Sequence, residues 1–161
     1  MHTHAALITR FYDAFAKKDG AAMAACYTPD VTFTDPAFGL LRGVEAGAMW
    51  RMLTARAADL VIRHSNVEAN DQSGRCDWEA DYTFAATGRW VENRIHAEFE
   101  FRDGLISKHV DHFDVWRWSG MAIGVPGRLL GWAPFFRSAI QKKARGQLFA
   151  TMTKEGVPRP A

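Results

Sequence analysis

The sequence predicts an α+β fold in which helices precede a long antiparallel sheet. Residues 78–114 read as three consecutive strands, joined by two turns that each contain glycine. Segments with apolar residues at helical spacing come before this meander. A strongly curved sheet with these N-terminal helices over its concave face would form a cone with one open end. Such a cone supplies a small-molecule pocket without any special motif.

The first half of the chain is predicted to contain three helices. The first covers about 5–18, with Thr3 as its N-cap, and carries one apolar stripe made of Leu7, Ile8, Phe11, Ala14 and Phe15. Asp19 is expected to cap a short second helix over 21–27. The remaining segments are a turn at 28–30, a strand over 31–35, a third helix over 44–57 and a strand over 60–69.

The meander has a predicted register that sorts its side chains between two faces. The first hairpin pairs Ala85 with Trp90, and the second pairs Phe101 with Leu105 across a three-residue loop. The inner face then sets Trp78 opposite Ala97, Ile95 opposite Asp111 and Asn93 opposite Phe113. The outer face gains complementary pairs: Glu79 with His96, Asp81 with Arg94 and Glu98 with Lys108.

Three polar residues intrude on the apolar inner face: Asn93, His109 and Asp111. Burying a polar group is costly unless something satisfies it, so these residues are the first functional candidates. His109 and Asp111 are two apart on one strand and can touch, either as a structural polar pair or as a catalytic one. His112 points through the sheet, so no metal site is expected here.

Other residues complete the candidate site. Asp35, which precedes Pro36, is either a turn residue that bonds its own backbone or a second pocket carboxylate. Asn93 and Tyr82 can donate to a ligand oxygen or satisfy Asp111. The predicted ligand-binding set is Tyr82, Asn93, Phe33, Trp50, Trp78 and Phe113.

Composition excludes several classes of protein. The 161 residues fit one compact core, and a net charge of +2 is too small to indicate nucleic-acid binding. Cys26 and Cys76 form no metal or disulfide pattern, so buried thiols are expected. No apolar run reaches the length of a membrane span, and the N-terminus has no signal-peptide pattern. A cytoplasmic location is the default expectation.

The chain changes character after Asp114. Residues 116–118 are expected to end the sheet, and four glycines interrupt the segment that follows. A helix over about 134–152 carries both apolar and basic residues. We therefore expect a domain over 1–118 and a helical extension over 119–161. The extension packs on the domain or a partner subunit, or its residues 128–152 lie on a membrane surface or dock a partner.

The order of elements resembles the NTF2-like superfamily, more narrowly its SnoaL-like and ketosteroid-isomerase-like branch, over about residues 5–118. The matching pieces are 7–12, 27–31, Asp35-Pro36 with Gly39, Gly43 and 101–106. These residues specify architecture more than chemistry. The resemblance implies a homodimer formed through the outer face of the sheet.

The resemblance also implies roles for individual residues. Asp35-Pro36 matches the Asp base that precedes Pro in ketosteroid isomerases, whereas Phe11 and Ala97 occupy the positions of their two oxyanion-hole donors. Asp111 resembles the acid–base Asp of SnoaL-type cyclases, with Asp114 a poorer match. It also falls near the last-strand Asp of limonene epoxide hydrolases, but no inward Arg accompanies it.

These observations predict a cofactor-free enzyme that isomerises, cyclises or hydrates an apolar ligand bearing a carbonyl or hydroxyl. Asp111 would be the acid–base group and Asp35 a second carboxylate, while His109, Asn93 and Tyr82 would orient the ligand. The alternative is a ligand-binding module that uses the same pocket without catalysis.

Overall fold

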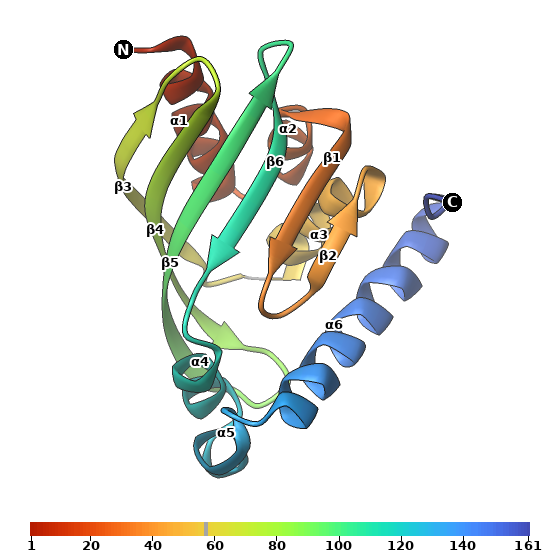
Figure 1. Ribbon diagram of the computed structural model, residues 1–161. Helices are drawn as coiled ribbons and strands as arrows, with labels where there is room; N and C mark the ends of the chain where they lie inside the picture. The colour runs from red at the N-terminus through yellow and green to blue at the C-terminus, as the bar shows by residue number, and fades with distance from the viewer. Residues whose placement is uncertain (57) are drawn as a thin grey trace.

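The structure is a computed structural model that describes residues 1–56 and 58–161. It confirms the predicted α+β fold with a curved sheet (Figure 1). The strands are β1 (Tyr27–Asp35), β2 (Gly39–Arg42), β3 (Val61–Ala69), β4 (Ser73–Phe84), β5 (Arg89–Arg102) and β6 (Leu105–His112). The helices are α1 (Thr3–Ala16), α2 (Gly20–Ala24), α3 (Val44–Arg56), α4 (Val115–Ala122), α5 (Val125–Leu130) and α6 (Pro134–Glu155).

The six strands form one sheet in the order β2-β1-β6-β5-β4-β3, and α1, α2 and α3 cover one of its faces (Figure 1). The sheet is mixed rather than purely antiparallel as predicted, because β1 runs parallel to β6. This pairing places the first strand of the chain beside the last one. It is therefore the contact that brings residues of the two halves of the sequence together.

Both hairpin registers differ from the predicted ones by two residues. Trp78 pairs with Ile95, and the first hairpin closes through Phe84 and Arg89. The second hairpin has a two-residue turn, Asp103 and Gly104, both with positive φ, followed by a bulge at Ser107 of β6. Because side chains alternate along a strand, the two-residue shift exchanges partners but keeps residues on their predicted faces. On the turn side of the bulge the shift is one residue, so Ile106 lies opposite Phe101 and is buried.

The outer face therefore still carries pairs of opposite charge, but the residues that pair with one another differ from the predicted ones. Lys108 bonds Glu100 at 3.0 Å instead of Glu98, and Arg63 on β3 bonds Asp81 at 2.6 Å. His96 bonds Asp77 at 2.7 Å instead of lying opposite Glu79. These ion pairs are exposed, so each contributes at most about 1 kcal/mol to stability.

The ends of several elements also differ from the prediction. α1 begins at Thr3, and the side chain of His2, not Thr3, caps it by accepting from the backbone N–H of His4. Residues 28–30 lie within β1 rather than in a turn, and β2 was not predicted. Asp19 does cap α2, as predicted. The predicted helix over 44–57 ends at Arg56, and Ala57 lies outside the described residues.

Residues 116–118 were predicted to end the sheet but instead form part of α4. The Asp114 carboxylate caps this helix by accepting from the N–H of Arg117. Trp118 and Ser119, on either side of the predicted domain boundary, both lie within α4. α4, α5 and the start of α6 lie together at one end of the sheet, and α6 then runs back beside β2 (Figure 1).

Two apolar clusters hold the structure. The larger one joins the inner face of the sheet to α1, α2 and α3, and it also contains Leu148 and Met152 from the last turns of α6, which are fully buried. The smaller one places Val91 of β5 against Val115, Trp118 and Ala122 of α4. Within the described residues, no helix combines the length and apolar character needed to cross a bilayer.

Candidate functional site

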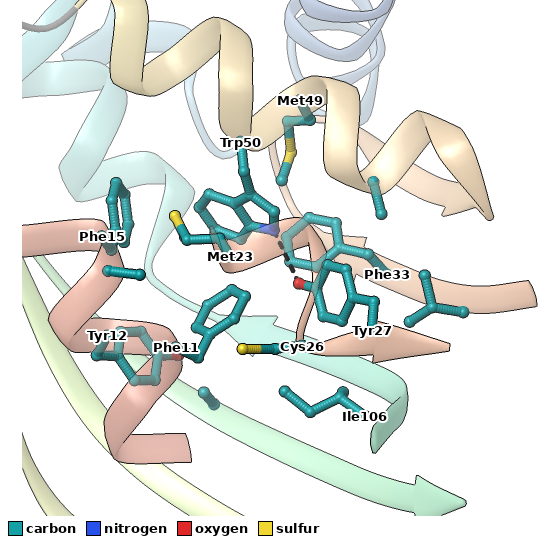
Figure 2. Close-up of a cluster of buried hydrophobic side chains, with 14 of the residues drawn as sticks. Phe11, Tyr12, Phe15, Met23, Cys26, Tyr27, Phe33, Met49, Trp50 and Ile106 are labelled. Atoms are coloured by element: carbon teal, nitrogen blue, oxygen red, sulfur yellow. Dashed lines mark hydrogen bonds between the residues drawn. The ribbon is translucent and has the colours of Figure 1, made fainter. Parts of the chain in front are cut away.

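A chain of buried hydrogen bonds crosses the inner face of the sheet. Trp50 Nε1 of α3 donates to the Tyr27 hydroxyl at 2.8 Å (Figure 2), and that hydroxyl lies 2.8 Å from His109 Nδ1. His109 Nε2 lies 2.8 Å from Asp111 Oδ1, which also accepts from Trp78 Nε1 at 3.3 Å. The parallel pairing of β1 with β6 creates this chain, because it places Tyr27 and His109, which are 82 residues apart, side by side.

The donor and the acceptor of each hydrogen bond in this buried series follow from its two ends, the indole of Trp50 and the carboxylate of Asp111. The indole of Trp50 can only donate, so the Tyr27 oxygen accepts there and its own proton is free for His109 Nδ1. Burial raises the pKa of Tyr27 well above its ordinary value, which keeps that proton in place at neutral pH. His109 is then the tautomer protonated on Nε2, and it donates to Asp111.

Aromatic rings enclose this chain. The His109 ring is fully buried, lies parallel to Trp50 with a centroid distance of 6.1 Å, and meets Phe33 edge-on at 5.0 Å. Phe11 and Phe99 complete the enclosure at 5.5 and 4.5 Å. A ligand therefore cannot touch His109 without displacing rings. Trp50, Phe33 and Trp78 were predicted to line a pocket. Trp50 and Phe33 instead pack against His109 in this closed interior.

Asp35 stands at the end of β1, next to Asp111. The parallel register pairs Phe33 with His109 and Thr34 with Val110, so its continuation sets Asp35 beside Asp111 on the same face. Asp35 Oδ1 accepts from the backbone N–H groups of Ala37 at 3.0 Å and Phe38 at 2.6 Å. The predicted turn role is therefore present.

The Asp35 carboxyl also has an unusual proton affinity. Desolvation is the main cause that raises its pKa to about 7, and the negative charge of Asp111 adds to the effect. The two backbone N–H bonds act in the opposite direction but are outweighed. Asp35 is half-buried, whereas Asp111 is 3% exposed. Of the two carboxyls, Asp35 is the more accessible one.

The other predicted ligand-binding residues lie farther along the sheet, toward α4. The Tyr82 hydroxyl accepts from Trp118 Nε1 of α4 at 2.9 Å, and among the described residues no hydrogen bond joins it to Asp111. Asp111 pairs with Ala97 rather than Ile95, which leaves Asn93 four residues farther along β5, about 13 Å away. Tyr82 and Phe113 are half-buried and Asn93 is 8% exposed. The structure thus separates the buried hydrogen-bonded chain through His109 from a second group near Asp35, which consists of Tyr82, Asn93 and Phe113 and lies closer to α4.

Sequence reasoning missed Tyr27 and the donor role of Trp50. The sequence predicts Tyr27 at the end of a helix. Its contact with His109 depends on the parallel pairing of β1 with β6, which the sequence does not indicate. Tyr12 is a second buried phenol, and its hydroxyl has no hydrogen-bond partner among the described residues. Burial is the main cause, and the charge of Asp111 a further one, that raises the pKa of Tyr12 well above its ordinary value.

A hollow of about 700 Å³ lies between β5 and α4, and two smaller ones lie beside β3 and β4 and between β2 and α6. Asp35, His109 and Asp111 do not line these three hollows. His112 bonds Glu98 at 3.0 Å on the outer face, away from His109, as predicted. Among residues 1–56 and 58–161, no three His, Cys, Asp or Glu side chains gather as metal ligands.

Comparison with solved structures supports the fold. An NTF2-like protein of unknown function from Burkholderia pseudomallei K96243 has a TM-score of 0.64 and 18% identity, over 75% of this chain and 98% of that one. An LEH-like epoxide hydrolase from M. tuberculosis has a TM-score of 0.63 and 18% identity, over 80% and 96% of the two chains. A protein with a ketosteroid-isomerase-like fold from Catenulispora acidiphila DSM 44928, in complex with trimethylamine, has a TM-score of 0.64 and 15% identity, over 80% and 97%.

No curated protein sequence matches the chain. The model of one protein family does, and it describes a SnoaL-like domain and matches residues 8–109. This segment runs from α1 to the His109 position of β6, so it contains the sheet, the three covering helices and most of the polar chain. The resemblance read from the sequence is thereby confirmed. The protein belongs to the SnoaL-like family and has an NTF2-like fold.

Proposed function

We propose that the protein is a cofactor-free proton-transfer enzyme, acting on an apolar ligand with a carbonyl or hydroxyl group, in which Asp35 is the acid–base residue. One observation carries the proposal: Asp35 is a partly accessible carboxyl whose pKa is raised to about 7. A group with a pKa near the working pH is best suited both to remove and to return a proton. A strongly perturbed carboxyl beside another one is a frequent feature of active sites.

The division of roles between the two carboxyls follows from their contacts. Asp111 accepts from His109 and Trp78 and is nearly inaccessible, so its role is to add to the effect of desolvation, which is the main cause of the raised pKa of Asp35. Asp35 has accepting bonds only at Oδ1 among the described residues, which leaves Oδ2 for the ligand. This assignment reverses the order expected from the sequence, in which Asp111 was the primary acid–base group.

The reaction this site supports is a proton shift. The Asp35 carboxylate takes a proton from a carbon that lies between a carbonyl and a C=C bond of the ligand, and the electron pair of the C–H bond moves into a dienolate. The protonated carboxyl then returns the proton to the far carbon of the original C=C bond, so the product is the conjugated isomer and no cofactor is consumed. Tyr82 and Phe113, both half-buried near this end of the sheet, would have to shift to admit the ligand.

Two other catalytic arrangements of this fold are incomplete in this protein. Ketosteroid isomerases stabilise the enolate with two donors, but Phe11 and Ala97 occupy those positions and both are fully buried. The solved structures of similar fold include an epoxide hydrolase, and such a reaction would call for an inward Arg beside the carboxyls. Arg94 in the middle of β5 is exposed and lies 3.9 Å from Glu79 on the outer face.

The test is deuterium exchange in D₂O at carbons next to the carbonyl of a panel of apolar cyclic ketones, followed by NMR. Asp35→Asn should lower the protein-catalysed rate by about 10²- to 10⁴-fold, the usual contribution of a general base. Asp103→Asn, in the exposed turn after β5, is the matched control and should leave the rate unchanged. Asp111→Asn should retain exchange but move its pH profile to lower pH. Exchange that survives in Asp35→Asn, or is absent from the parent protein for the whole panel, would refute the proposal and leave ligand binding alone.

A further inference from the structure

The end of the molecule formed by α4, α5 and the start of α6 exposes an unusual concentration of apolar side chains. Leu129 of α5 is 66% exposed and Phe135 of α6 is 67% exposed. Val125, Leu130, Trp132 and Trp116 are also exposed. We call these six residues the apolar tip. Val125 and Leu129 are four apart, so they lie on one side of α5. Contiguous exposed apolar residues of this kind usually mark an interaction site.

Arginines border the apolar tip. Arg89, Arg117 and Arg128 line the hollow of about 700 Å³ between β5 and α4, together with Trp90 and Trp116. Asp114 is the acidic residue of that lining, and its carboxylate is engaged as the N-cap of α4. Arg137 follows on the first turns of α6, where its Nε donates to the carbonyl of Gly131.

These arginines differ from those on the outer face of the sheet. There, Arg63, Arg75 and Arg102 each lie within 4 Å of a carboxylate. Across residues 1–56 and 58–161, no carboxylate lies within that distance of Arg89, Arg117, Arg128 or Arg137. Within the described residues these four arginines therefore form no ion pair, and they outnumber Asp114, the one carboxylate that lines the hollow. An anionic surface is the natural complement of this positive charge.

We propose that the apolar tip and its four arginines dock the protein on the surface of an anionic lipid bilayer. Leu129, Phe135 and Val125 would enter the boundary between headgroups and acyl chains, and the arginines would contact lipid phosphates. The indole N–H groups of Trp132 and Trp116 already donate to the carbonyls of Leu129 and Arg128, at 2.9 and 2.8 Å. Their rings can therefore occupy the interface, where tryptophan is enriched, without an unsatisfied donor.

A second copy of the chain is a poorer occupant of this surface. A two-fold dimer places the same patch against itself, so the arginines of both copies would face one another. A lipid surface instead supplies many negative charges and an apolar layer together. The proposal does not involve Asp35, and its outcome is independent of the proposed proton transfer.

The experiment is co-sedimentation of the full chain with vesicles of phosphatidylcholine alone, or with about one third phosphatidylserine. We expect binding to the anionic vesicles, little binding to the neutral ones, and release at about 1 M NaCl, where charges are screened within about 3 Å. The double substitution Leu129→Ser/Phe135→Ser should weaken binding at least tenfold. Arg128→Gln, whose side chain makes no hydrogen bond among the described residues, should weaken it about fivefold, the effect of one basic residue at such a surface.

The controls are Val61→Ser on β3, which removes an apolar residue that is 49% exposed and lies away from the tip, and Arg94→Gln on the outer face. Both should bind vesicles as the parent protein does. The proposal fails if the parent does not bind anionic vesicles at low salt, or if the controls lose as much binding as the tip variants. It also fails if the tip substitutions only dissolve a dimer in sedimentation velocity. Glycerol phosphate that binds the parent and Leu129→Ser/Phe135→Ser equally, without vesicle binding, would identify a soluble phosphate as the ligand instead.

Discussion

The Tyr27→Phe substitution tests the buried polar chain most directly. It removes one oxygen atom and leaves the ring that packs against Phe11 and Ile106 (Figure 2). Two buried groups then lose their partner: the N–H of Trp50 and the Nδ1 of His109. An unsatisfied buried group costs about 1–3 kcal/mol, so the free energy of unfolding should fall by about 2–6 kcal/mol. For a chain of this length that corresponds to a melting temperature roughly 5–20 °C lower.

Tyr12→Phe is the matched control. It makes the same chemical change at a phenol that is equally buried, but the Tyr12 hydroxyl has no partner among the described residues. Its loss should be neutral or stabilise the protein by about 1 kcal/mol, because an unsatisfied buried hydroxyl disappears.

Urea unfolding followed by circular dichroism provides both free energies, with unchanged m-values as the condition for comparing them. Nitrogen NMR of His109 in the parent should show the tautomer protonated on Nε2. Equal costs for the two substitutions, or a cost below about 0.5 kcal/mol for Tyr27→Phe, would refute the hydrogen-bond chain as described.

Three further predictions concern Asp35 and two glycines. Because folding raises the pKa of Asp35 from 3.8 to about 7, the folded state holds more protons between these values, and its stability should fall by up to about 4 kcal/mol as the pH rises through that window. In urea unfolding measured from pH 4 to 8, Asp35→Asn should remove this dependence of the free energy of unfolding on pH. A difference in that free energy between variant and parent that stays constant with pH would contradict the prediction. Gly127→Ala should destabilise the protein by roughly 1–3 kcal/mol, because its new methyl would stand 2.0 Å from the carbonyl oxygen of Ser119. Gly146→Ala, in the exposed part of α6 with nothing within 4 Å, should instead stabilise by about 0.5–1 kcal/mol, and thermal unfolding of the two variants should give shifts of opposite sign.

The sequence predicts much of this fold because local patterns carry most of it. Alternation in the meander assigned Asn93, His109 and Asp111 to the inner face, and the structure has all three buried there. This assignment is correct although the predicted register was wrong, because a shift of two residues leaves each side chain on the same face of the sheet. The register near the turn at Asp103 and Gly104 was predicted wrongly because a bulge adds one residue, Ser107, to β6, and no periodicity in the sequence reveals it.

The parts that escaped prediction depend on contacts between distant segments. The hydrogen bond from Tyr27 to His109 requires a parallel pairing that neither segment signals by itself. The packing of α4 against Val91 turned residues 116–118 from a strand end into a helix, with Asp114 as its cap. The raised pKa of Asp35 likewise arises from burial and from Asp111, which only the folded chain brings near.

The central position of β6 has a consequence for how the chain acquires its structure. β6 is the last strand to be synthesised, yet it lies between β1 and β5. Until it is in place, the β1–β2 hairpin has no edge to join, and the rest of the sheet ends at β5. Such non-local closure slows folding and couples distant segments into one transition. A nascent chain that stops before Leu105 should therefore expose two unpaired strand edges, whose protection depends on completion of a single hairpin.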